Sequence, residues 1–265
     1  RLAMLVSGAL AMILAESIGW RTTYVLMVIF LAVGVLGTLF APEPEERVVP
    51  PKTLKEAIWE PWNEFFSRPG AWGFIFLIVF YKLGDAFAGS LTTSFLIRGG
   101  GFSLGEVGVV NKGMGLIATI FGGLAGGIMM TRLGLYRSLM LFGILQAISN
   151  LSFMILATLG KNFPMMMFAV AFENLSGGMG TVAFVAFLMA LCNHRFTATQ
   201  FALLSALASV GRVYAGPPSG FLADTFGWLT FFLITFLVAL PGLILLVRFQ
   251  DKIHQLEKKK EIFSS

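Results

Sequence analysis

The chain has 265 residues, of which 57% are hydrophobic and only 12% are charged, with a mean hydropathy of +0.83 and a formal net charge of +5. Soluble domains carry about 25% charged residues, so this composition excludes a water-soluble fold and indicates a protein embedded in lipid. The single Cys192 excludes a disulfide framework and a cysteine-based metal cluster. The two histidines, His194 and His254, lie far apart in the sequence, and we expect no metal site.

Eight apolar stretches set the expected topology, because one transmembrane helix needs about 20 apolar residues. They cover 2–15, 22–41, 71–97, 103–131, 135–159, 164–191, 198–223 and 228–249. The first is short and follows Arg1, so it also fits a signal peptide, although the repeat described below favours a span. We therefore predict an all-α polytopic membrane protein with about eight transmembrane helices.

The segment 42–70 is a polar linker between the second and third spans. Its apolar residues recur at helical spacing, as in Leu54, Ile58 and Trp62. The charged residues of the opposite face are Lys55, Glu56, Glu60 and Glu64. This pattern predicts an amphipathic helix, bent at Pro61, that lies flat in the membrane interface. A simple tether between the spans is the alternative interpretation.

Basic residues are distributed unequally between the two ends of the predicted spans. If 42–70 is cytoplasmic, the outer side holds only Arg21, Arg98 and Lys161 of the 19 Lys and Arg residues. Cytoplasmic loops of membrane proteins carry an excess of Lys and Arg, so this orientation is favoured and the C-terminal tail, 251–265, is cytoplasmic. The positive charge therefore needs no nucleic-acid partner.

A short repeat relates the two ends of the chain. Residues 15–20 (Ala-Glu-Ser-Ile-Gly-Trp) align without gaps with residues 223–228 (Ala-Asp-Thr-Phe-Gly-Trp), and both segments fall at an outer turn between two spans. The first two spans thus correspond to the last two of the six spans that follow the linker. Two six-helix halves in parallel repeat resemble the major facilitator fold.

We therefore expect an incomplete major facilitator fold. Residues 1–41 form the last two helices of the N-terminal half, and 42–70 form the cytoplasmic linker with its amphipathic helix. Residues 71–250 form the six-helix C-terminal half, and 251–265 form the tail.

Five ionisable residues fall well inside the predicted spans, where each costs about 2.5–3.5 kcal/mol if it faces lipid. They are Lys82, Asp85, Lys112, Glu173 and Arg212. They must face a cavity or each other, and their single excess positive charge suits a substrate that carries carboxylates. Asp85 and Glu173 are candidate proton carriers. The alternative is that they form salt bridges that only fix helix packing, and Lys82 and Asp85 have the i, i+3 spacing for this.

Polar residues accompany these charges on the same helix faces. They include Thr92 and Thr93 beside Asp85, Asn111 beside Lys112, Asn174 beside Glu173, and Ser205 and Ser209 beside Arg212. The four spans concerned are the first, second, fourth and fifth of the C-terminal half, which border the central cavity in a major facilitator fold. The third span, 135–159, has only Gln146 and Asn150 as polar exceptions.

Longer motifs in these spans resemble the AmpG muropeptide permeases. They are 81–88, 91–99, 105–112, 172–181, 198–207 and 210–217. The resemblance implies proton-coupled import of anhydromuropeptides, which are GlcNAc-anhydro-MurNAc sugars with or without a stem peptide. It also implies the inner membrane of a Gram-negative bacterium, a place in peptidoglycan recycling, a link to β-lactamase induction, and no cofactor besides the proton gradient.

On this resemblance, the substrate carboxylates would suit Lys82, Lys112 and Arg212. The sugar hydroxyls would suit Asn111, Asn174, Thr92 and Thr93. Family members carry four helices before the position of Arg1, so we expect a truncated chain, and a non-transporting fragment is one alternative.

An importer of another anionic solute, such as acetyl-CoA or a siderophore, is a second alternative to muropeptide import. The sequence contains no His-Glu-x-x-His or Gly-x-Ser-x-Gly motif, and no Ser/His pair lies in the spans. We therefore predict that the protein is not an enzyme.

Overall fold

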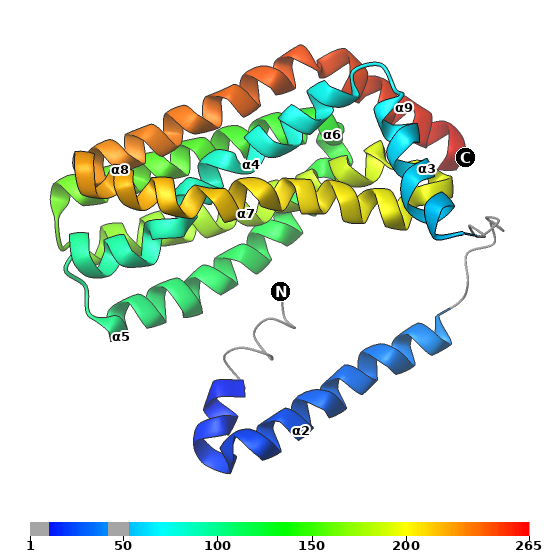
Figure 1. Ribbon diagram of the computed structural model, residues 1–265. Coiled ribbons are helices and arrows are strands. Elements are labelled where there is room, and N and C mark those ends of the chain that lie inside the picture. The colour runs from blue at the N-terminus through cyan, green and yellow to red at the C-terminus, as the bar shows by residue number, and fades with distance from the viewer. Residues whose placement is uncertain (1–10, 42–52, 265) are drawn as a thin grey trace. The chain divides into compact units, whose positions relative to one another are not determined.

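The computed structural model of the chain describes residues 11–41 and 53–264, which contain no β-strand. The chain divides into two units, Arg1–Pro50 and Pro51–Ser265. In the first unit, helix α2 (Ala11–Phe40) is broken at Gly19, which has a φ of 78° and a ψ of 157°. Most of the predicted first span, 2–15, lies outside the described residues, whereas the second, 22–41, coincides with the longer part of α2 (Figure 1).

The second unit is a bundle of long helices with two shorter helices, α3 and α9, at one end (Figure 1). Its elements are α3 (Leu54–Phe66), α4 (Ala71–Ser94), η2 (Phe95–Gly99), α5 (Leu104–Val107), η3 (Gly108–Met114), α6 (Gly115–Leu159), α7 (Phe163–Leu191), η4 (His194–Phe196), α8 (Thr197–Arg248) and α9 (Gln250–Ser264). The elements η2 and η3 are π-helical, and η4 is a 3₁₀ turn. A helix is present where the amphipathic linker helix was predicted: it is α3, with Thr53 as its N-cap and Pro61 inside it, while its predicted place in the membrane interface stays a prediction.

Five helical stretches of the described chain are long and apolar enough to cross a membrane. They are Ile18–Phe40, Ala71–Gly99, Leu104–Leu159, Phe163–Leu191 and His194–Arg248. Two of them, with 56 and 55 residues, would be about 80 Å long if straight, whereas a bilayer core is about 30 Å thick. They therefore cannot cross the membrane only once.

Two glycines divide these long stretches. Gly134 in α6 has a φ of 77° and a ψ of 175°, and Gly227 in α8 has a φ of 77° and a ψ of 167°. This conformation is accessible mainly to glycine, and at each position the chain turns back on itself, which is plain for α8 in Figure 1. The predicted spans 103–131, 135–159, 198–223 and 228–249 are thus separate crossings. Gly19 and Gly227, which the sequence repeat aligns, have nearly the same conformation.

Two apolar clusters form the core of the second unit. The first lies at the end that carries α3 and α9, and its members include Phe65, Phe74, Leu139, Phe187 and Ile253. The second lies at the opposite end, and its members include Phe95, Phe153, Met166, Phe231 and Phe232. Along α4, α6 and α7, buried or partly buried polar side chains occupy the stretch between the two clusters. We call these residues the polar layer; they are Lys82, Asp85, Thr92, Gln146, Ser149, Asn150, Glu173 and Ser176.

The outer surfaces of the long helices are apolar. Large side chains such as Trp72, Phe121 and Tyr214 are 62–72% exposed. An extended apolar exterior around a partly polar interior is the arrangement expected of a protein dissolved in lipid.

Close packing of α6 against α7 depends on glycines in the first half of α6. A Cβ atom on Gly122 would overlap the carbonyl oxygen of Leu175, and one on Gly126 would lie 2.7 Å from the Cα atom of Met179. Small residues allow such close backbone approach between membrane helices. This contact holds α7 beside α6 and thereby positions Glu173 and Asn174.

Candidate functional site

The centre of the polar layer is a contact among three side chains from two helices. Lys82 and Asp85, one turn apart on α4, form an ion pair with 3.5 Å between Nζ and Oδ2. Gln146, from the second half of α6, lies 3.5 Å from Lys82 Nζ through its Oε1 atom and 3.4 Å from Asp85 Oδ2 through its Nε2 atom. The Lys82 side chain is 14% exposed and that of Asp85 is 33% exposed, so the pair lies partly within the bundle.

Two aromatic rings lie next to Lys82 of this ion pair. The Tyr81 and Phe184 rings are stacked with 5.4 Å between centroids, and Lys82 Nζ lies 5.9 Å from the centroid of Phe184. Tyr81 donates a hydrogen bond to the backbone carbonyl of Leu139. Both rings belong to the first apolar cluster, so Lys82 lies directly against the edge of that cluster.

Glu173 brings a second carboxyl group into the polar layer. It is partly buried on α7, within hydrogen-bonding reach of Thr92 and within electrostatic range of Asp85. The two predicted proton carriers lie on different helices and are close enough for their charges to interact. Two neighbouring carboxyl groups with one ammonium group beside them are chemically suited to hold and release a proton.

Thr93 and Asn111 form a second polar contact. The Asn111 side-chain amide donates to the Thr93 hydroxyl at 3.2 Å. Thr93 lies two residues before the start of the π-helical η2, and Asn111 lies within the π-helical η3. Single π-helical turns inside longer helices occur frequently at functional sites. Thr92 is buried and Thr93 is exposed, so the two threonines, which we expected on one face, point in different directions.

Asn174 is used mainly in helix packing. Its Oδ1 atom accepts a hydrogen bond from Thr119 at 3.0 Å, and its Nδ2 atom donates to the carbonyl of Val170 at 2.9 Å. Asn150, in contrast, is 1% exposed, and its Nδ2 atom has no hydrogen-bond partner among the described residues. Buried donors without an acceptor are rare in folded proteins, so the polar layer has unused hydrogen-bonding capacity beside Gln146.

Arg212 lies on α8, on an exposed face that also carries Ser205 and Ser209. The neighbouring Gly211 is buried, and a Cβ there would lie 3.3 Å from Leu83 of α4, so Arg212 lies beside the helix that carries the Lys82–Asp85 pair. Lys112 lies in η3, but its side chain is outside the described part of the chain. The expectation that these residues share one site with the polar layer stays a prediction.

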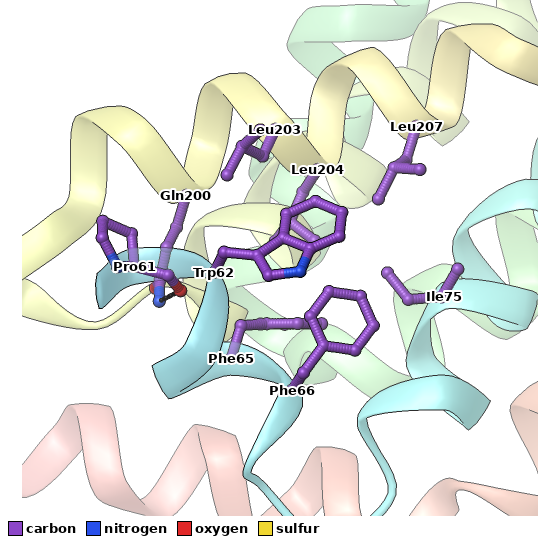
Figure 2. A pocket seen from close by; sticks show the side chains of 9 residues that line it. All are labelled: Pro61, Trp62, Phe65, Phe66, Ile75, Gln200, Leu203, Leu204 and Leu207. Carbon is purple, nitrogen blue, oxygen red and sulfur yellow. Dashed lines mark hydrogen bonds between the residues drawn. The ribbon is translucent and has the colours of Figure 1, made fainter. Parts of the chain in front are cut away.

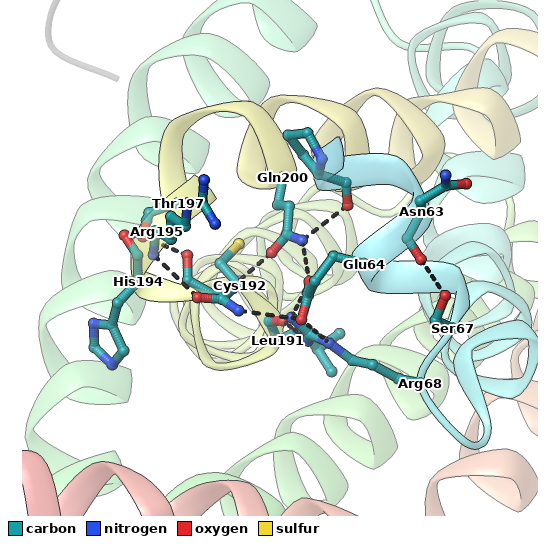
Figure 3. Close-up of polar contacts among 12 residues, drawn as sticks. Asn63, Glu64, Ser67, Arg68, Leu191, Cys192, His194, Arg195, Thr197 and Gln200 are labelled. Atoms are coloured by element: carbon teal, nitrogen blue, oxygen red, sulfur yellow. Dashed lines mark hydrogen bonds and ion pairs between the residues drawn. The ribbon is translucent and has the colours of Figure 1, made fainter. Parts of the chain in front are cut away.

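A separate polar cluster fixes the linker helix α3 at one end of the bundle (Figure 3). Glu64 accepts hydrogen bonds from Gln200 Nε2 at 2.6 Å and from Asn193 Nδ2 at 3.1 Å, and it forms an ion pair of 2.6 Å with Arg68. Gln200 also donates to the carbonyl of Pro61 at 3.0 Å. We call these residues the α3 clamp, because they join α3 to the start of α8.

The charge state of the α3 clamp is set by its hydrogen bonds. Burial alone would raise the pKa of Glu64, but the hydrogen bonds from Arg68, Gln200 and Asn193 outweigh it and hold the pKa of this carboxyl below its usual value. Glu64 is therefore ionised at neutral pH. The sequence placed Glu64 only on the solvent face of an amphipathic helix, and nothing in its local spacing indicates partners more than 120 residues away.

Apolar side chains complete the contact of α3 with the bundle (Figure 2). Trp62, Phe65 and Phe66 of α3 enclose a small pocket with Ile75 of α4 and with three leucines of α8. The leucines are Leu203, Leu204 and Leu207. The pocket has no charged lining and belongs to the packing of the linker helix.

Comparison with known proteins identifies the class to which this fold belongs. The family model of the Major Facilitator Superfamily matches residues 1–160 and 86–263. The chain therefore belongs to the Major Facilitator Superfamily and is a multi-pass membrane protein, as the sequence predicted. This is a family of transporters, and the protein is not an enzyme.

The chain is also similar in sequence to individual members of this family. The chain is 57% identical over 248 residues to the anhydromuropeptide permease of Escherichia coli K12, which covers 93% of this chain and 50% of the relative. It is 34% identical over 261 residues to a putative transporter, AmpG 4, of Rickettsia felis, covering 96% of this chain and 63% of the relative. An uncharacterized protein of Haemophilus influenzae is 35% identical over 259 residues. The chain thus spans about half the length of the Escherichia coli relative and somewhat under two thirds of the others.

Proposed function

We propose that the protein imports anhydromuropeptides across the inner membrane of a Gram-negative bacterium, coupled to protons. It would thereby serve peptidoglycan recycling and influence β-lactamase induction. The observation that carries this proposal is the 57% identity, over 93% of the chain, to a relative named anhydromuropeptide permease. The chemistry of the polar residues supports it independently.

The substrate class fits the side chains inside the bundle. Anhydromuropeptides carry a carboxylate on the lactyl group of the sugar when no stem peptide is attached, and on the stem peptide when one is, and these groups suit Lys82, Lys112 and Arg212. Arg212 supports this role best, because an exposed guanidinium in the middle of a span costs about 2.5–3.5 kcal/mol in lipid and needs a watery or charged partner. Sugar hydroxyls both donate and accept hydrogen bonds, which suits the Thr93–Asn111 pair and, more weakly, Thr92 and Asn174.

Proton coupling is assigned to the neighbouring carboxyl groups of Asp85 and Glu173. In the proposed cycle, a proton taken up by this pair removes one negative charge beside Lys82. The Lys82 ammonium is then less neutralised by Asp85 and more available to a substrate carboxylate. Release of the proton on the cytoplasmic side restores the ion pair and favours release of the substrate.

Uptake of a labelled anhydromuropeptide tests the proposal, in cells that lack their own permease and produce the complete protein encoded by the gene. We expect uptake that a proton uncoupler abolishes. Asp85→Asn, Glu173→Gln and Arg212→Ala should each lower uptake while the amount of protein in the membrane is unchanged. The matched control is Asp251→Asn, on the exposed part of α9, which should leave uptake unchanged. No uptake by the unchanged protein would overturn the proposed substrate, and full uptake by all three variants would overturn the site.

A further inference from the structure

Gln146 is the residue of the polar layer that contacts the Lys82–Asp85 pair, and the proposed function gives it no role. It lies in the middle of the second half of α6, in a span without interior ionisable residues, and it is only 6% exposed. Burying a primary amide in an apolar helix bundle is unfavourable unless both its donor and its acceptor find partners. Here both partners are the charged pair of α4, at 3.5 Å for Lys82 and 3.4 Å for Asp85.

The helix opposite Gln146 has space for this side chain because of a glycine. A Cβ atom on Gly180 of α7 would lie 2.6 Å from Oε1, 2.7 Å from Cδ and 2.9 Å from Nε2 of Gln146. Three atoms of one amide would thus be too close. A Cβ on Gly177, one turn earlier, would lie 3.9 Å from Nε2, which is an ordinary contact. The Gln146 amide is therefore held between Gly180 on one side and the Lys82–Asp85 pair on the other.

This inference rests on the proposed function. We infer that Gln146 is a positioning residue for transport, which orients the Lys82–Asp85 pair, and that position 180 is glycine to admit it. The amide links the two charges from outside their own helix, with its oxygen toward the ammonium and its nitrogen toward the carboxylate. Because both distances are at the long end for hydrogen bonds, a displacement of well under 1 Å breaks them. The separation of the two charges then depends on α4 alone.

The distances give a specific test with a matched control on the same helix. Gly180→Ala should displace the amide and lower uptake about tenfold, whereas Gly177→Ala should leave uptake unchanged. Gln146→Met, which keeps the length of the side chain but removes both polar atoms, should lower uptake to a similar extent. In the double variant Gln146→Ala with Gly180→Ala, the steric conflict is absent, so the protein should be as abundant and as thermally stable as Gln146→Ala alone. Its uptake should stay low.

A readout of charge separates a positioning role from a purely structural one. The charged groups that face Gln146 are Lys82 and Asp85 of α4 and, beyond Asp85, Glu173 of α7. The pH dependence of the residual uptake by Gln146→Met should therefore differ from that of the unchanged protein. A residue that only fills space would lower abundance or thermal stability and leave the pH profile in place.

The outcomes distinguish this inference from the proposed function. Absence of uptake by the unchanged protein would remove the proposed function. Normal uptake by the unchanged protein together with normal uptake by Gly180→Ala and Gln146→Met would overturn the inference alone. Equal loss for Gly177→Ala and Gly180→Ala, or an unaltered pH profile in Gln146→Met, would also contradict it.

Discussion

Replacing Glu64 by Gln tests whether polar contacts hold the linker helix α3 on the bundle. The carboxylate accepts hydrogen bonds from Arg68 and Asn193 on one oxygen and from Arg68 and Gln200 on the other. Whichever way a glutamine amide turns in Glu64→Gln, its nitrogen faces at least one of these donors. The variant should therefore lose the contact on one side of the clamp.

The magnitude follows from the bonds that join different elements. The Arg68 pair is formed within one segment and is 30% exposed, so it adds little to docking. Asn193 and Gln200 lie on the α7–α8 connection and on α8, and the variant loses the bond from one of them; because hydrogen bonds to charged groups contribute about 1.5–3 kcal/mol, the loss is about 2 kcal/mol. Since 1.4 kcal/mol is a factor of ten, opening of α3 should become about 30-fold more frequent.

Hydrogen–deuterium exchange of the α3 amides measures this opening in the purified protein. The control is Glu60→Gln, which removes an exposed ion pair of 3.6 Å with Arg195 and should change α3 exchange by less than about fivefold. Exchange in the middle of α7 should not change in either variant. Equal exchange of α3 in Glu64→Gln and the unchanged protein, or an equal rise in both variants, would refute the reasoning.

Three further outcomes follow from the structure. Hydrogen bonds hold the pKa of Glu64 below 4.5 in the folded state. Its contribution to α3 docking should therefore be complete above pH 4.5 and be lost as the pH falls through the lower pKa of the folded protein. Hydrogen–deuterium exchange of α3, corrected for the intrinsic rate, should rise over that pH range in the unchanged protein and not in Glu64→Gln. Burial raises the pKa of the Cys192 thiol to about 11, so maleimide should label it about 100-fold more slowly at neutral pH than a free cysteine, and rapid labelling would contradict this. Gly122→Ala would bring a methyl group against the Leu175 carbonyl, whereas at Gly123 the nearest atom would be 3.8 Å away; thermal unfolding should show a loss of about 1–3 kcal/mol for the first variant and a change within about 0.5 kcal/mol for the second.

Local sequence patterns predicted the helices well, because hydrophobic length decides which segments cross a bilayer. The glycine turns at Gly134 and Gly227 fell between predicted spans. The capping box of Ser103 and Glu106, which opens α5, also follows from local spacing. These features depend on residues within a few positions of each other.

Contacts between distant segments were predicted less well, because helical spacing gives the face of a residue and not its partner. The pairing of Lys82 with Asp85 was foreseen as an alternative, since both lie on one helix. The bridge to Gln146 required the packing of α6 on α4, and the α3 clamp required the turn between α7 and α8. The sequence showed Gln146, like Asn150, only as a polar side chain in an apolar span, and that signal does not identify its partners.

The central claim is that the exposed face of α8 and the polar layer border a watery chamber for an acidic substrate. Cysteine accessibility tests it directly in the complete protein with Cys192 and any other native cysteine replaced by Ser. Ser209→Cys lies one turn before Arg212 on that face, and Tyr214→Cys replaces a 72% exposed side chain on another face of the same helix. We predict that a charged, membrane-impermeant thiol reagent labels position 209 and not position 214, and that an anhydromuropeptide protects position 209. Equal labelling of both positions, no labelling of either, or labelling at 209 that the substrate leaves unchanged would contradict the account.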